Sequence, residues 1–271
     1  MQPIKIGHMA EDGSPVGRIL AVANQKGGVG KTTTAINLAS SLALAGRRVL
    51  LVDVDPQGNL TSGVGLKGRR AEAGTIYEAL MTDAEPSAFL LESQVKNLSV
   101  IPADRNLTGA EIELVSLPQR EHRLQRVLNP LRARFDLIFI DCPPSLGLLT
   151  LNALVAADAV LIPLHCEYFA LEGLADLVGT LRRVRGALNP ALDIEGVLLT
   201  MYDDRTNLGH LVARDVREFF KEKVFNTVIP RNVRLGEAPS HGMPAVLYDA
   251  KSRGAAAYVA LAQEMLARHA A

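Results

Sequence analysis

Short apolar runs alternate with helical patterns along this chain, and glycine-rich turns separate several of them. Residues 18–24 (RILAVAN) form an apolar run that ends at such a turn, which predicts a buried strand. A helical apolar pattern follows over residues 32–45 and stops at Gly46, a residue type that often ends helices. Residues 48–53 (RVLLVD) form a second apolar run. Together these segments predict a strand–helix–strand unit.

The alternation continues toward the C-terminus and predicts the fold class. Strands that alternate with helices usually pair in parallel, so we expect one α/β domain with a mostly parallel, twisted sheet and helices on both faces. Residues 63–86 predict loops and a short helix outside the sheet. The domain is predicted to span residues 18–271, behind a flexible leader over residues 1–17. Further strands are predicted at residues 98–102, 137–141, 159–163, 194–201 and 227–230, and helices at residues 171–188 and 208–223.

Composition narrows the class of protein. Aromatic residues make up 4% of the 271 residues, so the core must be largely aliphatic. The formal net charge is zero, which argues against a strongly basic nucleic-acid binder but leaves room for a local basic patch. Cys142 and Cys166, the two cysteines, match neither a disulfide framework nor a zinc pattern, which favours a reduced, cytoplasmic protein. No apolar run reaches the roughly 18 residues of a membrane span.

The glycine-rich turn after the first predicted strand carries the strongest chemical signal. Its glycines allow backbone N–H groups to surround phosphate oxygens, and the N-terminus of the following helix favours anions. Lys31 is expected to reach the β- and γ-phosphates of a nucleotide, and the Thr32 hydroxyl to bind Mg²⁺. The usual phosphate-loop pattern begins with glycine, but Gln25 stands at that position. The predicted nucleotide contacts here are Lys26, Gly27, Gly28, Val29, Gly30, Lys31, Thr32 and Thr33.

Two aspartate motifs accompany this loop. Residues 52–59 (VDVDPQGN) place Asp53 and Asp55 at the end of the second predicted strand. Residues 137–141 (LIFID) are four apolar residues followed by Asp141, a pattern in which the aspartate holds Mg²⁺. With the phosphate loop, these motifs stand in the chain order expected of a P-loop nucleotide hydrolase.

The three motifs resemble those of the deviant Walker A ATPases of the ParA/MinD family, which have a second lysine at the start of the loop. The resemblance implies a P-loop NTPase fold and slow hydrolysis of ATP with Mg²⁺. It implies that Lys26 crosses a homodimer interface to the partner's nucleotide, while Gly27 permits the close approach of the subunits. It also implies that Asp55 orients the attacking water and that Asp53 lies near the water shell of the metal.

The C-terminal third is similar to the Soj-like chromosomal ParA group over residues 200–206, 227–234, 237–242 and 252–254. That resemblance implies adenine recognition by the Pro230 backbone and the Asn232 side chain. It further implies that the ATP-bound dimer binds double-stranded DNA non-specifically, associates with the nucleoid, and is stimulated to hydrolyse ATP by a ParB-like centromere-binding partner. For DNA contacts we select Arg205 and Arg234, since both stand in loops that could share one surface.

Three alternatives can be separated by sequence features. A MinD-like membrane-associated ATPase would end in a basic amphipathic helix, but residues 255–271 contain one arginine, and we expect this tail to pack on its own domain without stable membrane association. An electron-transfer protein resembling nitrogenase reductase would place cysteines in cluster loops, whereas Cys142 and Cys166 lack the flanking residues of that group. A non-hydrolysing ATP-binding adaptor would not need Asp55.

Overall fold

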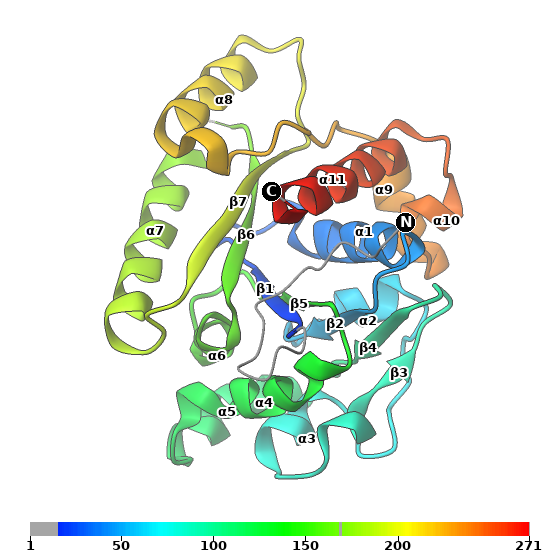
Figure 1. Ribbon diagram of the computed structural model, residues 1–271, viewed down its shortest axis with the longest axis vertical. Helices are drawn as coiled ribbons and strands as arrows, with labels where there is room; N and C mark the ends of the chain where they lie inside the picture. The colour runs from blue at the N-terminus through cyan, green and yellow to red at the C-terminus, as the bar shows by residue number, and fades with distance from the viewer. Residues whose placement is uncertain (1–15, 168–169, 271) are drawn as a thin grey trace.

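A computed structural model describes residues 16–167 and 170–270, and within them seven strands form one sheet (Figure 1). All neighbouring strands are parallel except β3 and β4, which pair antiparallel at one edge. The predicted α/β domain with a mostly parallel sheet is therefore confirmed. In sheet order the strands are β3 (Leu91–Glu92), β4 (Leu98–Ile101), β2 (Val49–Asp53), β5 (Leu137–Asp141), β1 (Arg18–Val22), β6 (Ala159–His165) and β7 (Asp193–Thr200).

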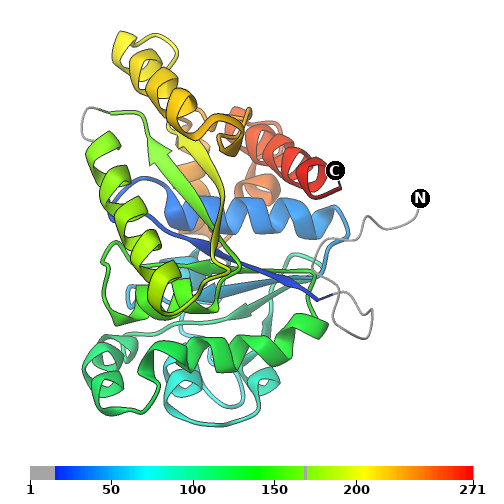
Figure 2. The same ribbon diagram turned by 60° about the vertical axis from the view of Figure 1, so that its left-hand side comes forward.

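Helices cover both faces of this sheet, as the two ribbon views show (Figures 1 and 2). The long helices α1 and α11 lie together on one face, and α3 to α6 lie on the other. The helices are α1 (Lys31–Leu44), α2 (Asn59–Gly63), α3 (Ile76–Met81), α4 (Leu107–Glu113), α5 (Arg123–Leu128), α6 (Leu148–Ala156), α7 (Ala170–Ala187), α8 (Asn207–Phe220), α9 (Val233–Glu237), α10 (Ala245–Tyr248) and α11 (Arg253–Ala270).

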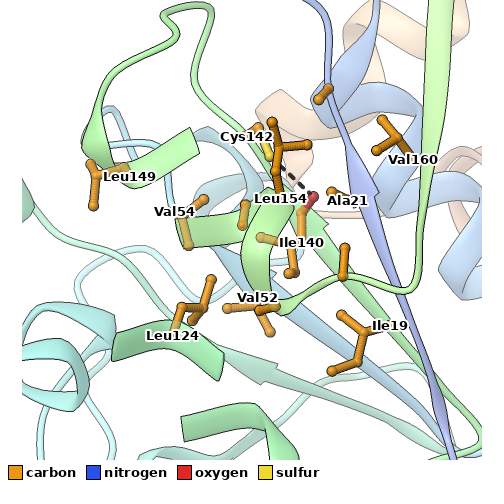
Figure 3. Packing of buried hydrophobic residues seen from close by; sticks show 14 of the residues in the cluster. Ile19, Ala21, Val52, Val54, Leu124, Ile140, Cys142, Leu149, Leu154 and Val160 are labelled. Carbon is orange, nitrogen blue, oxygen red and sulfur yellow. Dashed lines mark hydrogen bonds between the residues drawn. The ribbon is translucent and has the colours of Figure 1, made fainter. Parts of the chain in front are cut away.

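The strands are buried on both faces because successive side chains point to opposite sides. In β1, Leu20 and Val22 pack with the α1 and α11 layer, whereas Ile19 and Ala21 pack with the layer on the other face. Figure 3 shows the second layer, where Ile19 and Ala21 lie near Ile140 of β5. This division explains why the sequence shows continuous apolar runs at the strands.

One predicted strand is wrong. Residues 227–230 form no strand of the sheet and contact it only through single interactions beside β7. The Ile229 N–H donates to the Leu199 carbonyl at 2.9 Å, and Pro230 forms an isolated bridge with Tyr202. β7 ends at Thr200, and the next residue, Met201, has a φ of +47°, so the backbone leaves the extended conformation and no continuous ladder forms at residues 227–230. The chain instead turns there into α9.

The C-terminal tail packs against its own domain, as the sequence predicted. Tyr258, Leu261 and Met265 of α11 are buried, and the Tyr258 hydroxyl shares a 3.1 Å hydrogen bond with the Thr34 hydroxyl of α1. Within the described residues, no helix is both long enough and apolar enough to cross a membrane. Of the predicted leader, residues 1–15 lie outside the described part, and the Gly17 N–H donates to the Arg132 carbonyl at 2.9 Å.

Candidate nucleotide-binding site

The glycine-rich turn connects the carboxyl end of β1 to the first residue of α1, Lys31. Gly28 and Gly30 have φ angles of +74° and +87°, which side-chain-bearing residues rarely adopt. Gly30 is also the N-cap of α1, so the unpaired N–H groups of the first helical turn face the loop. The Thr200 hydroxyl at the end of β7 donates to the Val29 carbonyl at 2.8 Å and anchors the loop from behind.

Both lysines of the loop have partners within the same chain. The buried Lys31 ammonium donates to the Lys26 carbonyl at 2.9 Å. Burial lowers the pKa of Lys31, and the nearby carboxylate of Asp141 partly offsets this effect. The Lys26 ammonium forms an ion pair with Glu167, which follows β6. An ammonium group has three N–H donors, so Lys31 has further donors for a phosphate while it keeps this carbonyl.

The carboxyl ends of β2 and β5 place two buried carboxylates side by side. Asp53 and Asp141 are register partners across the two strands, and both are fully buried. Asp53 accepts hydrogen bonds from the Thr61 hydroxyl at 2.7 Å, the Thr61 N–H at 2.9 Å and the Asp55 N–H at 3.2 Å. Burial nevertheless raises the pKa of Asp53 to about 6.

Asp141 differs from Asp53 because neither of its carboxylate oxygens has a hydrogen bond of ordinary geometry within the described residues. Burial raises the pKa of Asp141 well above its usual value, and the negative charge of Asp53 adds to this effect. Thr32 and Lys31 lie close enough to favour the charged form and offset part of the rise. A buried carboxylate without donors is costly, so this position fits a bound cation or its water shell.

The loop after β2 turns Asp55 toward the site. Its carboxylate accepts from the Gln57 N–H at 2.9 Å, and its carbonyl accepts from the Gly58 N–H at 2.9 Å. Pro144, which follows β5, closes the other side: a Cβ added to Gly27 would lie 4.0 Å from the Pro144 Cβ. Asp55 and Pro144 therefore border the glycine-rich loop from two different strands.

These segments enclose a cavity of about 530 Å³. At its far end, the Asn232 Oδ1 accepts from the Arg234 N–H at 3.0 Å, so the amide nitrogen of Asn232 is the group left for a ligand. Tyr258, Leu235 and Ile229 supply apolar surface around it. The lining includes these residues named from the sequence: Gly27, Gly28, Gly30, Lys31, Thr32, Thr33, Asp55, Pro230 and Asn232.

Four of the residues predicted to bind the nucleotide or the metal do not line this cavity. Val29 is buried, Asp53 and Asp141 lie beneath the loop at the strand ends, and Lys26 extends toward Glu167. Their assigned roles remain predictions. Sequence reasoning missed the contribution of Tyr258 to the cavity, because this residue is 224 positions from Thr34, the α1 residue that its hydroxyl meets. Its only sequence signal is a lone aromatic residue in an alanine-rich helix.

The two predicted DNA contacts are each paired with acidic residues of the same chain. Arg205 forms a bidentate pair with Asp203 through hydrogen bonds of 2.8 and 2.7 Å. The Arg234 guanidinium donates to Glu237 at 2.7 Å and lies 3.3 Å from Asp249. The Arg205 side chain is 84% exposed and that of Arg234 is 46% exposed, and DNA contact by either one remains a prediction.

Comparison with known proteins places this geometry in a family. A family model described as an AAA domain matches residues 17–194. The chain is 58% identical over 253 residues to the chromosome partitioning protein ParA of Myxococcus xanthus, covering 93% of this chain and 89% of that one. It is 57% identical over 252 residues to the sporulation initiation inhibitor protein Soj of Bacillus subtilis, covering 93% and 99% of the two chains.

A solved structure shares the fold of this chain. It is described as cobyrinic acid a,c-diamide synthase from Mycobacterium smegmatis with a bound ATP analogue and magnesium, and it is 42% identical to this chain. The TM-score is 0.79, and the match covers 92% of this chain and 93% of that one. The similarity over nearly the whole length, together with the glycine-rich loop and the paired aspartates, shows that this chain belongs to the ParA/Soj family of chromosome-partitioning P-loop proteins.

Proposed function

We propose that this protein is a Mg²⁺-dependent ATPase switch for chromosome or plasmid partitioning. ATP binding drives formation of a homodimer that binds double-stranded DNA without sequence preference, and hydrolysis returns the subunits to the monomeric state. The observation that carries the nucleotide part is the Asp141 carboxylate. It is fully buried beside Lys31 and Thr32 and has no hydrogen bond of ordinary geometry from the part of the chain that the structure describes. A cation bound between Asp141 and the Thr32 hydroxyl would balance that charge.

The residues present fit Mg²⁺ and a triphosphate. Backbone N–H groups of residues 27–33 and the N-terminus of α1 are suited to phosphate oxygens, and Lys31 adds a positive charge. Thr32 and Asp141 would hold Mg²⁺, which supplies neutralisation of phosphate charge when bound. Asp53 is the weaker candidate in this set, because its oxygens already accept three hydrogen bonds. We assign it the positioning of Thr61 and of the strand end.

Hydrolysis is assigned to water held by Asp55. Phosphoryl transfer to water depends mainly on positioning and on neutralisation of charge. The Asp55 carboxylate lines the cavity, and the Gln57 N–H holds it in place at 2.9 Å. At the opposite end, the Pro230 backbone and the Asn232 side chain are assigned to adenine. The amide nitrogen of Asn232 can donate to a ring nitrogen of the base.

The switch part of the proposal rests on the family. The name of the ParA relative supports a role in chromosome partitioning. To that role we add, as part of the proposal, a ParB-like partner that stimulates hydrolysis and a location on the nucleoid. If ATP bridges only the dimer, nucleotide binding shifts the population toward that state. A membrane-associated role is less well supported, since the residues that would form a bilayer-facing stripe on α11 are buried against α1.

DNA binding measured with ATP, ADP and no nucleotide, at two salt concentrations, tests the proposal. Binding should require ATP and weaken steeply with salt, because phosphate contacts release counterions. Binding that is absent, or equal in all three states, would refute the partition switch and leave the ATPase assignment standing. Asp55→Ala should abolish ATP turnover but retain ATP-dependent dimers and DNA binding. Turnover at the parent rate would remove Asp55 from its assigned role.

A further inference from the structure

An ion pair joins the start of the phosphate loop to the segment after β6. The Lys26 ammonium contacts the Glu167 Oε1, and the two side chains are 36% and 38% exposed. The hydrogen bond from Lys26 lowers the pKa of Glu167 below its usual value. These residues are 141 positions apart in sequence, yet the pair lies beside a site in which Lys26 has an assigned role.

The fold brings the two residues together through neighbouring parallel strands. β1 leads into the phosphate loop and pairs with β6, whose carboxyl end leads to Glu167. Asn24 reinforces the junction: its Nδ2 donates to the Pro163 carbonyl at 2.8 Å, and its Oδ1 accepts from the Lys26 N–H at 3.0 Å. The Glu167 N–H donates to the His165 carbonyl at 2.9 Å. Both ends of the ion pair therefore stand on backbone fixed by hydrogen bonds.

This arrangement conflicts with the role of Lys26 in a dimer. A lysine that contacts the nucleotide of a partner subunit must point away from its own chain, whereas here its ammonium is held by its own subunit. To extend to a phosphate of a second subunit, the Lys26 side chain would have to turn away from Glu167. Dimer formation with ATP must then break one Lys26–Glu167 pair in each subunit.

We propose that Glu167 is a positioning residue that retains Lys26 on its own subunit and thereby raises the threshold for ATP-dependent dimerisation. The proposal rests on the proposed function, because it assumes the ATP-bound dimer. The Lys26 ammonium can exchange Glu167 for phosphate oxygens when ATP is bound. This exchange is favourable because a triphosphate carries more negative charge than one carboxylate does. Without nucleotide, Lys26 stays paired with Glu167, and it therefore does not stabilise a dimer of two nucleotide-free subunits.

The size of the effect follows from the exposure of the pair. Partly exposed ion pairs contribute little singly, but a symmetric dimer releases two of them, so their effects on the association constant multiply. Glu167→Gln removes the charge and keeps the shape. It should lower the protein concentration for half-maximal dimerisation with Mg-ATP by about 2- to 20-fold. Glu167→Asp keeps the charge on a shorter side chain and should restore most of the parental threshold.

The first measurement addresses the pair itself and needs no dimer. The full-length, nucleotide-free protein is acetylated briefly with acetic anhydride, and the modification of Lys26 is quantified by mass spectrometry. An ammonium group held by a carboxylate reacts slowly, so labelling of Lys26 should increase severalfold in Glu167→Gln. Glu121→Gln, which removes the carboxylate paired with Arg120, is the matched control and should leave Lys26 labelling unchanged. Equal labelling in the parent and in Glu167→Gln would overturn the proposal.

The second measurement is sedimentation with Mg-ATP over a range of protein concentrations, for the parent, Glu167→Gln, Glu167→Asp and Glu121→Gln. A lower threshold in Glu167→Gln alone supports the proposal. An unchanged or higher threshold in Glu167→Gln overturns the proposal. A higher threshold would mean that Glu167 stabilises the dimer. If the parent does not dimerise with ATP at all, the proposed switch fails, and the labelling experiment still decides whether Glu167 retains Lys26.

Discussion

Asp53 and Asp141 end two adjacent parallel strands as register partners, and only Asp53 has its charge satisfied by hydrogen bonds from the described residues. The Thr61 hydroxyl donates to Asp53 and accepts from the Ala103 N–H at 2.9 Å, so it also ties the end of β4 to the site. Burial raises the pKa of Asp141, and the negative charge of Asp53 raises it further. The buried charge of Asp141 is therefore unfavourable without a cation, and a bound cation would remove this unfavourable free energy.

Asp141→Asn should separate stability from ligand binding. An uncharged amide removes the cost of a buried, unsatisfied carboxylate, so the free energy of unfolding without nucleotide should rise by about 1–3 kcal/mol. The same change should abolish the additional rise in melting temperature that Mg²⁺ produces with ATP, because the cation loses its charged ligand. Thermal unfolding with and without Mg-ATP and EDTA measures both effects.

The control for this prediction is Asp83→Asn, at a carboxylate that is 89% exposed and lies 3.8 Å from the Arg123 guanidinium, a distance at which an exposed pair contributes little. It should change neither the stability nor the response to Mg-ATP. If Asp141→Asn destabilises the nucleotide-free protein and retains full stabilisation by Mg-ATP, the Asp141 carboxylate is not the cation ligand.

Tyr258→Phe should destabilise the domain by removing the hydrogen bond between α11 and α1. The change leaves the Thr34 hydroxyl of α1 buried without its 3.1 Å partner, which costs about 1–3 kcal/mol. Urea unfolding measures the loss. Tyr77→Phe is the matched control, because the Tyr77 hydroxyl bonds Glu113 at an exposed position and its removal should cost less. Equal losses in the two variants would contradict a special role for the α1–α11 contact.

Glu195→Gln should reveal a pH-dependent attachment of the C-terminal helix. The His269 Nε2 lies 2.6 Å from the Glu195 carboxylate, and the Arg18 guanidinium lies 2.8 Å from it. Burial opposes ionisation of Glu195, but the hydrogen bond and charge of His269 outweigh it, so the pKa lies below the usual value. The variant should lose about 1–3 kcal/mol at neutral pH.

The sign of the pH dependence follows from the lowered pKa of Glu195. A carboxyl group with a lower pKa in the folded state stabilises the protein above its unfolded pKa, about 4.3, and loses that contribution as pH falls through the folded value. The difference in unfolding free energy between the parent and Glu195→Gln should therefore shrink below about pH 4. Urea titrations at several pH values test this, and a difference that grows in acid would contradict it.

Arg205→Ala and Arg234→Ala should each weaken DNA binding by the ATP-bound protein at all sequences. If either side chain contacts a phosphate, its loss reduces the slope of log affinity against log salt by about 1. Arg126→Ala, an exposed arginine on α5, is the control for a general loss of charge. An unchanged slope in both test variants would mean that DNA binds to another surface. The role of Arg205 and Arg234 would then be limited to their ion pairs with acidic neighbours.

Much of the fold could be predicted because the relevant signals are local. Buried strands such as residues 137–141 appear in the sequence as continuous apolar runs. The predicted bounds of that strand match the observed ones. Residues 227–230 were misread because an apolar, β-branched run looks the same in sequence whether or not a ladder forms. The end of β7 at Thr200 and the positive φ of Met201 limit the contact with this edge strand to isolated bridges.

By itself, the sequence determined the glycine-rich loop and the strand-end aspartates, because backbone freedom and strand burial depend on neighbouring residues. Tertiary structure alone decided which charges meet. The pairing of β2 with β5 places Asp53 beside Asp141, and the pairing of β1 with β6 brings Glu167 to Lys26. The last pair joins residues that are 141 positions apart. Their energies depend on burial and distance, which strand order creates and local sequence does not encode.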